Sequence, residues 1–343
     1  MGEIVGAGLL AHVPTIVLPE RERKELNEGR EISLVPGLRK LRADVFERLD
    51  HDTVVVLDSH WATTVEFVVS AHARRAGLFT SEELPRGMCR MPYDYPGDPE
   101  LAHAVARSAD RHGTWITPVD DPFLPVHYAT VNLWKFLGEG LPAKKWVSIG
   151  VCQTGDTEDH LRLGRALADG IAALPGRRVL LVASGALSHT FWPLRELRAH
   201  ESSDPAHIRT PGARAADERR IAWLERGEHA QVLRTMPEFL THRPEARFGH
   251  YLMMIGALGE ERCTAAGRAY SAYENSVGTG QMHLWFDRPP RGWTAPATAT
   301  PGATVPATVA PGATVPMTVA PGATVPVPAT TGPDATDPSE AAV

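Results

Sequence analysis

The sequence predicts an α/β protein whose mixed, largely parallel central sheet is covered by helices on both faces. Short uninterrupted apolar runs, such as VVVL at 54–57 and VLLV at 179–182, recur along the chain. Runs of this kind are typical of strands that are buried on both faces. Stretches with helical periodicity alternate with these runs, as they do in proteins whose parallel strands are joined by helices.

Six strands and five helices follow from these patterns. Strands are predicted at residues 4–10, 53–58, 65–71, 146–151, 178–183 and 281–286. Helices are predicted at residues 38–49, 99–112, 157–173, 214–226 and 250–258. Asp98 followed by Pro99 is a typical helix start, and Gly113 is placed to end the same helix. Residues 85–98 are rich in Pro, Gly and Asp and predict a long irregular loop. The charged run at 20–31 predicts a solvated loop or helix face.

The composition divides the chain of 343 residues into two parts. Residues 1–288 are predicted to form a single catalytic domain, since the hydrophobic content of 43% is enough for a large core. Residues 289–343 carry the related segments TPGATVPATV, APGATVPMTV and APGATVPVPA. These repeats contain few charges and many prolines, so a disordered, partly polyproline-II tail is predicted. A recognition tail or spacer is the functional alternative for this segment.

Charge and cysteine content exclude several classes of protein. The formal net charge of −6 gives no electrostatic reason to expect nucleic acid or an anionic membrane as a partner. Three scattered cysteines form neither a disulfide framework nor a zinc-finger pattern, which favours a reducing cytoplasm. No secretory signal is evident near Glu3, and no run of 18 apolar residues predicts a membrane span.

Three histidines follow predicted strands at their carboxyl ends. His12 lies after the first apolar run, His60 after VVVLDS and His189 after RVLLVASGALS. Ligands of open α/β sheets bind outside the carboxyl ends of the strands, so these imidazoles are expected to converge there. Glu274 precedes a glycine-rich turn and adds a carboxylate. Two imidazoles and one carboxylate are the ligand set of non-haem Fe(II) oxygenases, with zinc as the competing metal.

The segments around these residues resemble one known family. They are AHVPT around His12, DSHW around His60, ASGALSH ending at His189, MPEF at 236–239, FGHYLMMIGAL at 248–258 and GTGQ at 278–281. In this order they are similar to class III extradiol ring-cleaving dioxygenases, the superfamily of the catalytic subunit of protocatechuate 4,5-dioxygenase. SEELP at 81–85 and MPYDYPGDPEL at 91–101 resemble most closely the 3,4-dihydroxyphenylacetate (homoprotocatechuate) 2,3-dioxygenases. The resemblance covers residues 1–288 and leaves out the tail.

The resemblance implies a metal site for Fe(2+). His12 and His60 match the two imidazole ligands of the family, and Glu274 takes the position of the carboxylate ligand. Glu260 and Glu261 are nearby alternatives for that carboxylate. Asp58, Ser59 and Ser188 are candidates for orienting the metal ligands through hydrogen bonds.

The resemblance also implies catalytic histidines. His189 matches the family's acid/base histidine, and histidine side chains accept and return protons near neutral pH. His127 falls where many members carry a second active-site histidine in an Asp-His-Gly context, but Val126 and Tyr128 flank it here. His127 is therefore predicted either to touch substrate or to be structural. His250 is predicted to lie in a core helix or to line the substrate pocket, and the other histidines to be structural or solvent-facing.

The implied activity is an oxidoreductase of aromatic catabolism that opens a catechol ring with O₂, with 3,4-dihydroxyphenylacetate as the favoured substrate and a ring-opened semialdehyde acid as product. Members of the family commonly form homo-oligomers, so one is expected here. The same chemistry on a 2-aminophenol, a gallate or another catechol remains open. A zinc hydrolase with the same ligands and a Memo-like non-catalytic binding protein are the two competing classes.

Overall fold

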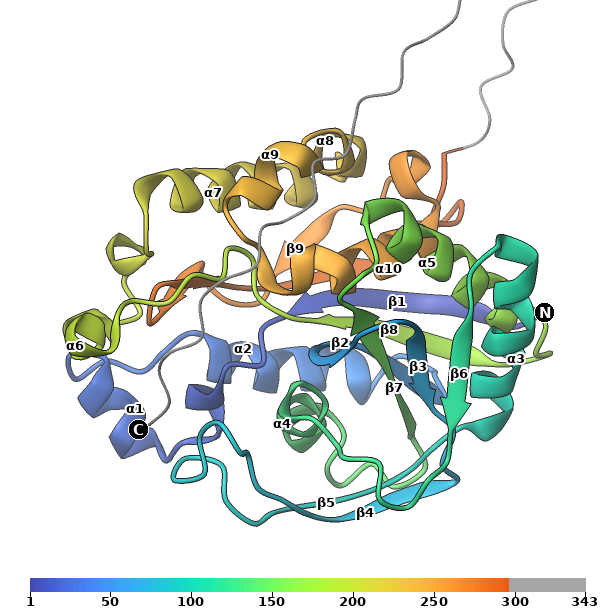
Figure 1. The fold of residues 1–343 in the computed structure, drawn as a ribbon, viewed down its shortest axis with the longest axis horizontal. Coiled ribbons are helices and arrows are strands. Elements are labelled where there is room, and N and C mark those ends of the chain that lie inside the picture. Colours follow the sequence, from blue (N-terminus) through green and yellow to red (C-terminus); the bar gives the residue numbers. More distant parts are fainter. Residues whose placement is uncertain (296–343) are drawn as a thin grey trace, which may run out of the picture. The chain divides into compact units, whose positions relative to one another are not determined.

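An eight-stranded mixed sheet forms the centre of the fold (Figure 1). This computed structural model describes residues 1–295. The strand order is β6-β3-β7-β2-β8-β1-β12-β9. The central strands β7, β2, β8 and β1 run parallel, and β6 is parallel to β3. The pairs β3–β7, β1–β12 and β12–β9 are antiparallel, so the predicted mixed, largely parallel sheet is confirmed.

The strands of this sheet are β1 (Glu3–Leu10), β2 (Thr53–Thr63), β3 (Phe67–Ser70), β6 (Ile116–Val119), β7 (Lys145–Cys152), β8 (Arg178–Ser184), β9 (Gly267–Ala269) and β12 (His283–Asp287). Two hairpins lie outside it, formed by β4 (Arg74–Phe79) with β5 (Met91–Pro96) and by β10 (Glu274–Ser276) with β11 (Thr279–Gln281).

The α-helices are α1 (Glu20–Leu26), α2 (Leu34–Leu41), α3 (Pro99–Ala109), α4 (Tyr128–Leu137), α5 (Thr157–Ala172), α6 (Leu194–Leu197), α7 (Pro211–Glu225), α8 (His229–Arg234), α9 (Met236–Thr241) and α10 (Gly249–Leu258). Short turns of 3-10 helix are η1 (Pro14–Val17), η3 (Asp110–His112), η4 (Arg198–His200), η5 (Pro205–His207), η6 (Glu245–Phe248) and η7 (Glu260–Arg262), and η2 (Arg42–Phe46) is a π-helix.

Helices cover both faces of the sheet, with α5 and α10 on one side and α2 and α4 on the other (Figure 1). Strand β8 shows how one strand serves both layers. Val179, Leu181 and Ala183 pack into the core beneath α5 and α10, whereas Leu180 and Val182 pack into the core beneath α2 and α4. Because successive side chains of a strand point to opposite faces, the uninterrupted apolar run is explained by this double burial.

The prediction of an irregular loop at 85–98 is wrong in part. Residues Met91–Pro96 form β5, which pairs with β4 in a two-stranded hairpin. Proline lacks a backbone donor and is therefore confined to edge strands and bulges. Both strands of this hairpin are edges, so the prolines that argued against a strand are tolerated. Helix α4 and strand β6 were not predicted.

Contacts of the chain with the core continue past the predicted domain end at residue 288. The Trp293 indole N–H donates to the carbonyl of Ile4 at 3.0 Å, and the Ala295 amide donates to the carbonyl of Arg262 at 3.0 Å. The domain boundary stays a prediction. The predicted disordered tail lies, from residue 296 on, outside the described residues.

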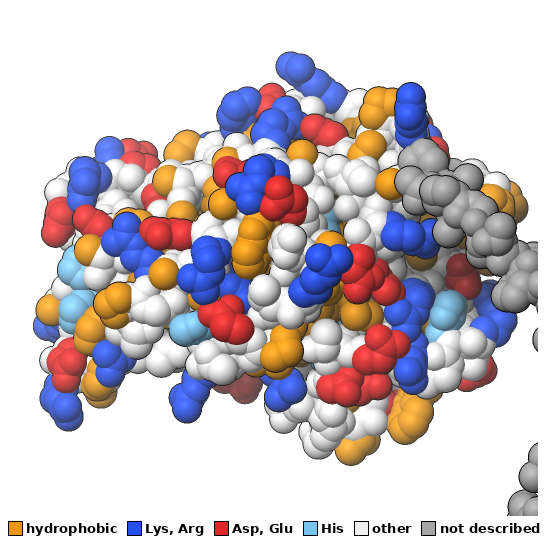
Figure 2. All heavy atoms as spheres, turned by 90° about the horizontal axis from the view of Figure 1, so that it is seen from above, with side chains coloured by type: hydrophobic (Ala, Val, Ile, Leu, Met, Phe, Trp, Pro, Cys, Tyr) orange, Lys and Arg blue, Asp and Glu red, His pale blue; other side chains and the backbone are white. Residues whose placement is uncertain are grey.

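Charges of both signs are interspersed on the face shown in Figure 2, and neither sign gathers into a broad patch there. That face therefore offers little long-range attraction to a strongly charged partner. Within residues 1–295, no helix combines the length and the apolar character that crossing a bilayer requires.

Close packing of α5 against α10 depends on Gly164. A Cβ atom there would lie 2.3 Å from the carbonyl oxygen of Met253 in α10. We expect Gly164→Ala to lower the free energy of unfolding by about 3 kcal/mol because the two backbones must separate. Urea unfolding measures this, with Gly87→Ala as the control, since a Cβ at Gly87 would meet its nearest atom at 3.5 Å. Equal unfolding midpoints for the two variants would contradict the expectation.

Candidate metal centre and active-site pocket

His12 follows β1 at its carboxyl end and is buried. Its Nδ1 lies 3.0 Å from the hydroxyl of Ser184, which ends the neighbouring parallel strand β8. The Ser184 hydroxyl donates its own proton to the carbonyl of Ala129 at 2.9 Å, so it accepts a hydrogen bond from His12 Nδ1–H. The lone pair of the ring is then on Nε2. Burial lowers the pKa of His12, which favours the neutral imidazole that metals bind.

His60 is presented by an irregularity in β2. The register of β2 against β7 shifts between Asp58 and Ala62. The buried Asp58 carboxylate accepts hydrogen bonds from the amides of His60 at 3.0 Å and Trp61 at 2.8 Å, which holds this bend. The His60 and His12 rings lie edge to face with centroids 5.9 Å apart. Asp58 thus acts on His60 through the backbone, as a positioning residue.

Glu245 is the carboxylate that the structure brings to these imidazoles. It begins η6 (Glu245–Phe248), and its Oε1 lies 3.6 Å from His12 Nε2. Oε1 accepts a hydrogen bond from the Ser59 hydroxyl at 2.8 Å, and Oε2 accepts one from the Ala186 amide at 2.5 Å. Ser59, which was predicted to orient a metal ligand, thus contacts this carboxylate.

The electrostatic surroundings of Glu245 favour the ionised form. Burial alone would raise the pKa of Glu245, but positive charge on His12, His189 and His250, present when these imidazoles are protonated, and the hydrogen bond from the amide of Ala186 outweigh burial and lower the pKa to about 2. No lysine or arginine side chain within residues 1–295 pairs with this carboxylate. A buried anion without a cationic partner is unfavourable, so this position suits a bound cation.

Glu274, the predicted carboxylate ligand, is placed elsewhere. Its Oε1 accepts a hydrogen bond from the amide of Ser33 at 2.6 Å, and it lines a separate cavity of about 100 Å³ whose lining includes none of the candidate histidines. The physical reason is the register of the β10–β11 hairpin, which pairs Glu274 with Gln281 away from the main sheet. Glu260 forms an ion pair with Arg165, and Glu261 is exposed.

The pocket next to Glu245 has a volume of about 570 Å³ and contains both predicted catalytic histidines, His127 and His189, together with His60. His189 packs edge-on against Phe191 with ring centroids 4.7 Å apart. The ring of His127 stacks on Trp61 at 5.9 Å, and burial lowers the pKa of His127. The structure therefore brings His12, His60 and His189 to one region, and His127, whose role was left open, lines the same cavity.

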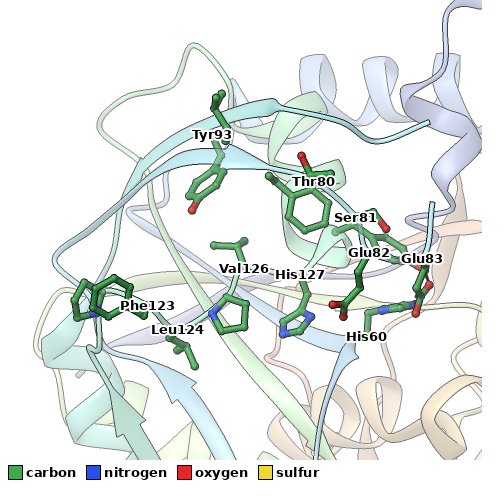
Figure 3. A pocket seen from close by; sticks show the side chains of 15 residues that line it. His60, Thr80, Ser81, Glu82, Glu83, Tyr93, Phe123, Leu124, Val126 and His127 are labelled. Carbon is green, nitrogen blue, oxygen red and sulfur yellow. Dashed lines mark hydrogen bonds and ion pairs between the residues drawn. The ribbon is translucent and has the colours of Figure 1, made fainter. Parts of the chain in front are cut away.

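A second cavity of about 360 Å³ adjoins the first, because both are lined by His60, His127, Glu82 and Glu83. Figure 3 shows the side chains of this second cavity, with Phe123, Leu124 and Val126 on one side and Glu82 and Glu83 beside His60 on the other. Its apolar walls suit an aromatic ring or an apolar substituent.

Tyr128 closes the site between the two imidazoles. Its hydroxyl contacts His60 Nε2, and its ring centroid is 3.9 Å from that of His60 and 5.3 Å from that of His12. Among the described residues, no three His, Cys, Asp or Glu side chains are placed so that together they could hold a metal ion. The donor types themselves, a neutral imidazole, a second imidazole and a buried carboxylate, fit a divalent metal.

Sequence reasoning missed Glu245 because no strand precedes it. It lies in PEARFGH, a turn between helices, and the three residues after it have left-handed backbone angles. The signal available in the sequence was an acid shortly before the apolar segment FGHYLMMIGAL, separated from it by Ala246 and Arg247. The contact of Ser184 with His12 was also missed. Its signal was its position at the carboxyl end of β8, which corresponds to the position of His12 just after β1.

His250 and several other histidines lie in the core. His250 is fully buried beside Phe248, so the core alternative holds for this residue. His229 contacts the Tyr251 hydroxyl and the carbonyl of Ala265, each at 2.9 Å. Other buried members are His51, His72, His160 and His283.

Buried neutral histidines make stability depend on pH. Burial lowers the pKa of His229 to about 4 and that of His283 to about 3, below the unfolded value near 6.5. Their contribution is therefore present above pH 6.5 and is lost as the pH falls toward 4. As the pH falls through this range, we expect each of these two histidines to lower the free energy of unfolding by up to about 1.4 kcal/mol per pH unit.

Urea unfolding at pH 7.5 and 5.0 measures this dependence. His283→Gln should show a smaller drop than the wild type, whereas the exposed His103→Gln should show the same drop. Asp217 acts in the opposite sense, because burial raises its pKa to about 6 and its contribution is lost as the pH rises through 6. The contribution of Asp217 is the same in every variant, so it cancels when the variants are compared at one pH. If His283→Gln loses as much free energy of unfolding between pH 7.5 and 5.0 as the wild type, His283 does not contribute to the pH dependence.

Comparisons with known proteins agree with this fold. Residues 6–285 match the family described as the catalytic LigB subunit of aromatic ring-opening dioxygenase. A 3,4-dihydroxyphenylacetate 2,3-dioxygenase of Escherichia coli is 27% identical over 263 residues, which are 76% of this chain and 92% of that enzyme. The crystal structure of an uncharacterized Escherichia coli K12 protein is similar with a TM-score of 0.55 at 17% identity, covering 82% of this chain and 99% of that protein. The last likeness concerns the fold alone. Because the family match spans most of the chain, this protein belongs to the family of catalytic LigB subunits of aromatic ring-opening dioxygenases.

Proposed function

We propose that the protein is a non-haem Fe(II)-dependent extradiol dioxygenase that opens the ring of 3,4-dihydroxyphenylacetate with O₂. The observation that carries the proposal is the buried carboxylate of Glu245, which has no lysine or arginine partner among residues 1–295 and lies 3.6 Å from His12 Nε2. The substrate is suggested by the name of the Escherichia coli relative. The product would be a ring-opened semialdehyde acid.

His12, His60 and Glu245 would hold the metal, with Glu245 in the position first assigned to Glu274. A ferrous ion bound by two imidazoles and one carboxylate supplies open positions for a catechol and O₂ and a route for electrons between them. Ser184 keeps the His12 Nε2 lone pair free, and Ser59 and the Ala186 amide orient Glu245.

His189 would carry the proton. It lines the same cavity as His60 and Glu245, so its imidazole can accept a proton from a catechol hydroxyl and return it to an oxygen later in the reaction. His127, stacked on Trp61 and facing both cavities, would contact the substrate ring or its substituent. We also expect the active form to be a homo-oligomer, which light scattering measures.

Anaerobic loading with Fe(II), followed by a panel of substrates and then O₂, tests the proposal. The panel contains 3,4-dihydroxyphenylacetate, other catechols, 2-aminophenol and gallate. Stoichiometric oxygen uptake with a new absorbing ring-fission product is expected for 3,4-dihydroxyphenylacetate. If only another member of the panel is turned over, that compound and not 3,4-dihydroxyphenylacetate is the substrate, and the dioxygenase activity is kept. Binding of zinc with hydrolytic activity, or no turnover of any member, would overturn the dioxygenase assignment.

A further inference from the structure

We propose that Arg247 binds the carboxylate of an acidic ring substituent, so that the protein selects catechols with a short anionic side chain. The inference rests on the proposed function, because it concerns the substrate of the same site. It adds the residue that recognises the carboxylate of the substituent.

The position of Arg247 relative to the reacting groups is the first argument. It lies two residues after Glu245 and lines the 570 Å³ cavity together with His60 and His189. Among the residues that line this cavity, Arg247 is the one lysine or arginine. A cavity of this size holds a single aromatic ring with a short substituent. An anionic substituent therefore finds its cationic partner at this residue.

The guanidinium of Arg247 is available for a ligand. Within residues 1–295 it forms no hydrogen bond or ion pair. Other arginines near acids are engaged, such as Arg220 with Glu238 at 2.6 Å. Arg247 is exposed, as unpaired arginines commonly are, but it also lines the cavity beside the candidate catalytic centre. Guanidinium groups bind carboxylates through two parallel hydrogen bonds, which orients the ligand as well as attracting it.

The backbone fixes where the Arg247 side chain begins. Ala246, Arg247 and Phe248 have φ angles of 46°, 55° and 64°, which are unfavourable for residues with a side chain. The fully buried Phe248, packed edge-on against Phe239 with centroids 5.1 Å apart, holds the turn in this conformation. Glu245 begins the same turn. The conformation of this turn therefore fixes where the backbone of Arg247 lies relative to the backbone of Glu245, the proposed metal ligand.

The acids of the cavity limit where an anionic group is accepted. Glu82 and Glu83 come from the segment after β4 and lie beside His60 (Figure 3). Glu83 Oε2 is 3.5 Å from His60 Nε2. A substrate carboxylate near these two acids would be repelled, whereas one near Arg247 would be attracted. Repulsion by the two acids and attraction by Arg247 together favour one orientation of an acidic catechol in the cavity.

Paired substrates and paired variants test the inference. The substrates are 3,4-dihydroxyphenylacetate and its neutral methyl ester, and the variants are Arg247→Gln and the control Arg243→Gln. Arg243 shares the left-handed backbone, with φ of 51°, but lines a different cavity. For Arg247→Gln we expect KM of the acid to rise about 10- to 100-fold with little change in kcat, and KM of the ester to stay within about twofold. Arg247→Lys should restore part of the loss.

A binding measurement provides a readout without turnover. Calorimetry of the metal-loaded protein with 4-hydroxyphenylacetate, which lacks the adjacent hydroxyl pair, should show weaker binding to Arg247→Gln than to the wild type or Arg243→Gln. Equal losses for acid and ester, or equal effects of the two variants, would overturn the role of Arg247 while leaving ring cleavage intact. If the wild type opens the ring of neither the acid nor its methyl ester and consumes no O₂, both the proposed function and this inference are overturned.

Discussion

Glu245→Gln is expected to abolish both iron binding and ring cleavage, whereas Glu274→Gln is expected to leave both unchanged. Glutamine keeps the size of the side chain but removes the charge of Glu245 that would bind the metal beside His12. Loss of a direct ligand should weaken metal binding by more than the 10- to 100-fold that loss of an orienting partner typically causes, so we expect at least about 100-fold. Glu274 is bound to the amide of Ser33, and a glutamine oxygen can accept the same hydrogen bond.

Metal content after anaerobic loading, binding isotherms with Fe(II) and oxygen uptake measure the effect. His12→Ala and His60→Ala should behave as Glu245→Gln does, and thermal unfolding of each variant checks that the fold is kept. If Glu274→Gln loses the metal and Glu245→Gln retains it, Glu274 and not Glu245 is the carboxylate ligand.

The sheet could be predicted well from the sequence because its signals are local. Strands β1, β2, β7 and β8 are short apolar runs, and burial on both faces leaves them little alternative structure. The imidazoles could be predicted for a related reason. His12 and His189 follow strands of a largely parallel sheet, so the topology alone brings them to one edge.

The carboxylate could not be predicted in this way because its place depends on tertiary structure. Glu245 reaches His12 from a turn between two helices, and its contacts to Ser59 and Ala186 join segments far apart in the sequence. Glu274 precedes a glycine-rich turn in the sequence, but it begins β10, and the hairpin of β10 and β11 places it next to Ser33. Pairing of a short hairpin is weakly encoded locally, and the same is true of β5, whose prolines argued against a strand.

His189→Ala is expected to keep the metal and to lose most of the rate. The imidazole of His189 lines the cavity with Glu245 but is absent from the proposed ligand set, so its removal should leave metal binding within about twofold of the wild type. Loss of a general acid/base group lowers kcat by about 10²- to 10⁴-fold. Single-turnover experiments should show that the acidic catechol still binds, since its recognition is assigned to Arg247 and the metal ligands.

Two controls separate a proton-transfer role from a structural one. His103→Ala removes an exposed histidine on α3 and should leave kcat unchanged. Added imidazole should restore part of the rate of His189→Ala, because this small base can occupy the space left in the cavity. The restored rate should depend on pH: it should follow the fraction of neutral imidazole if the limiting step needs a base, and the fraction of imidazolium if it needs an acid. A His189→Ala protein that binds no iron would make His189 a ligand, and one with an unchanged rate would move the proton-transfer role to His127, which lines the same cavity.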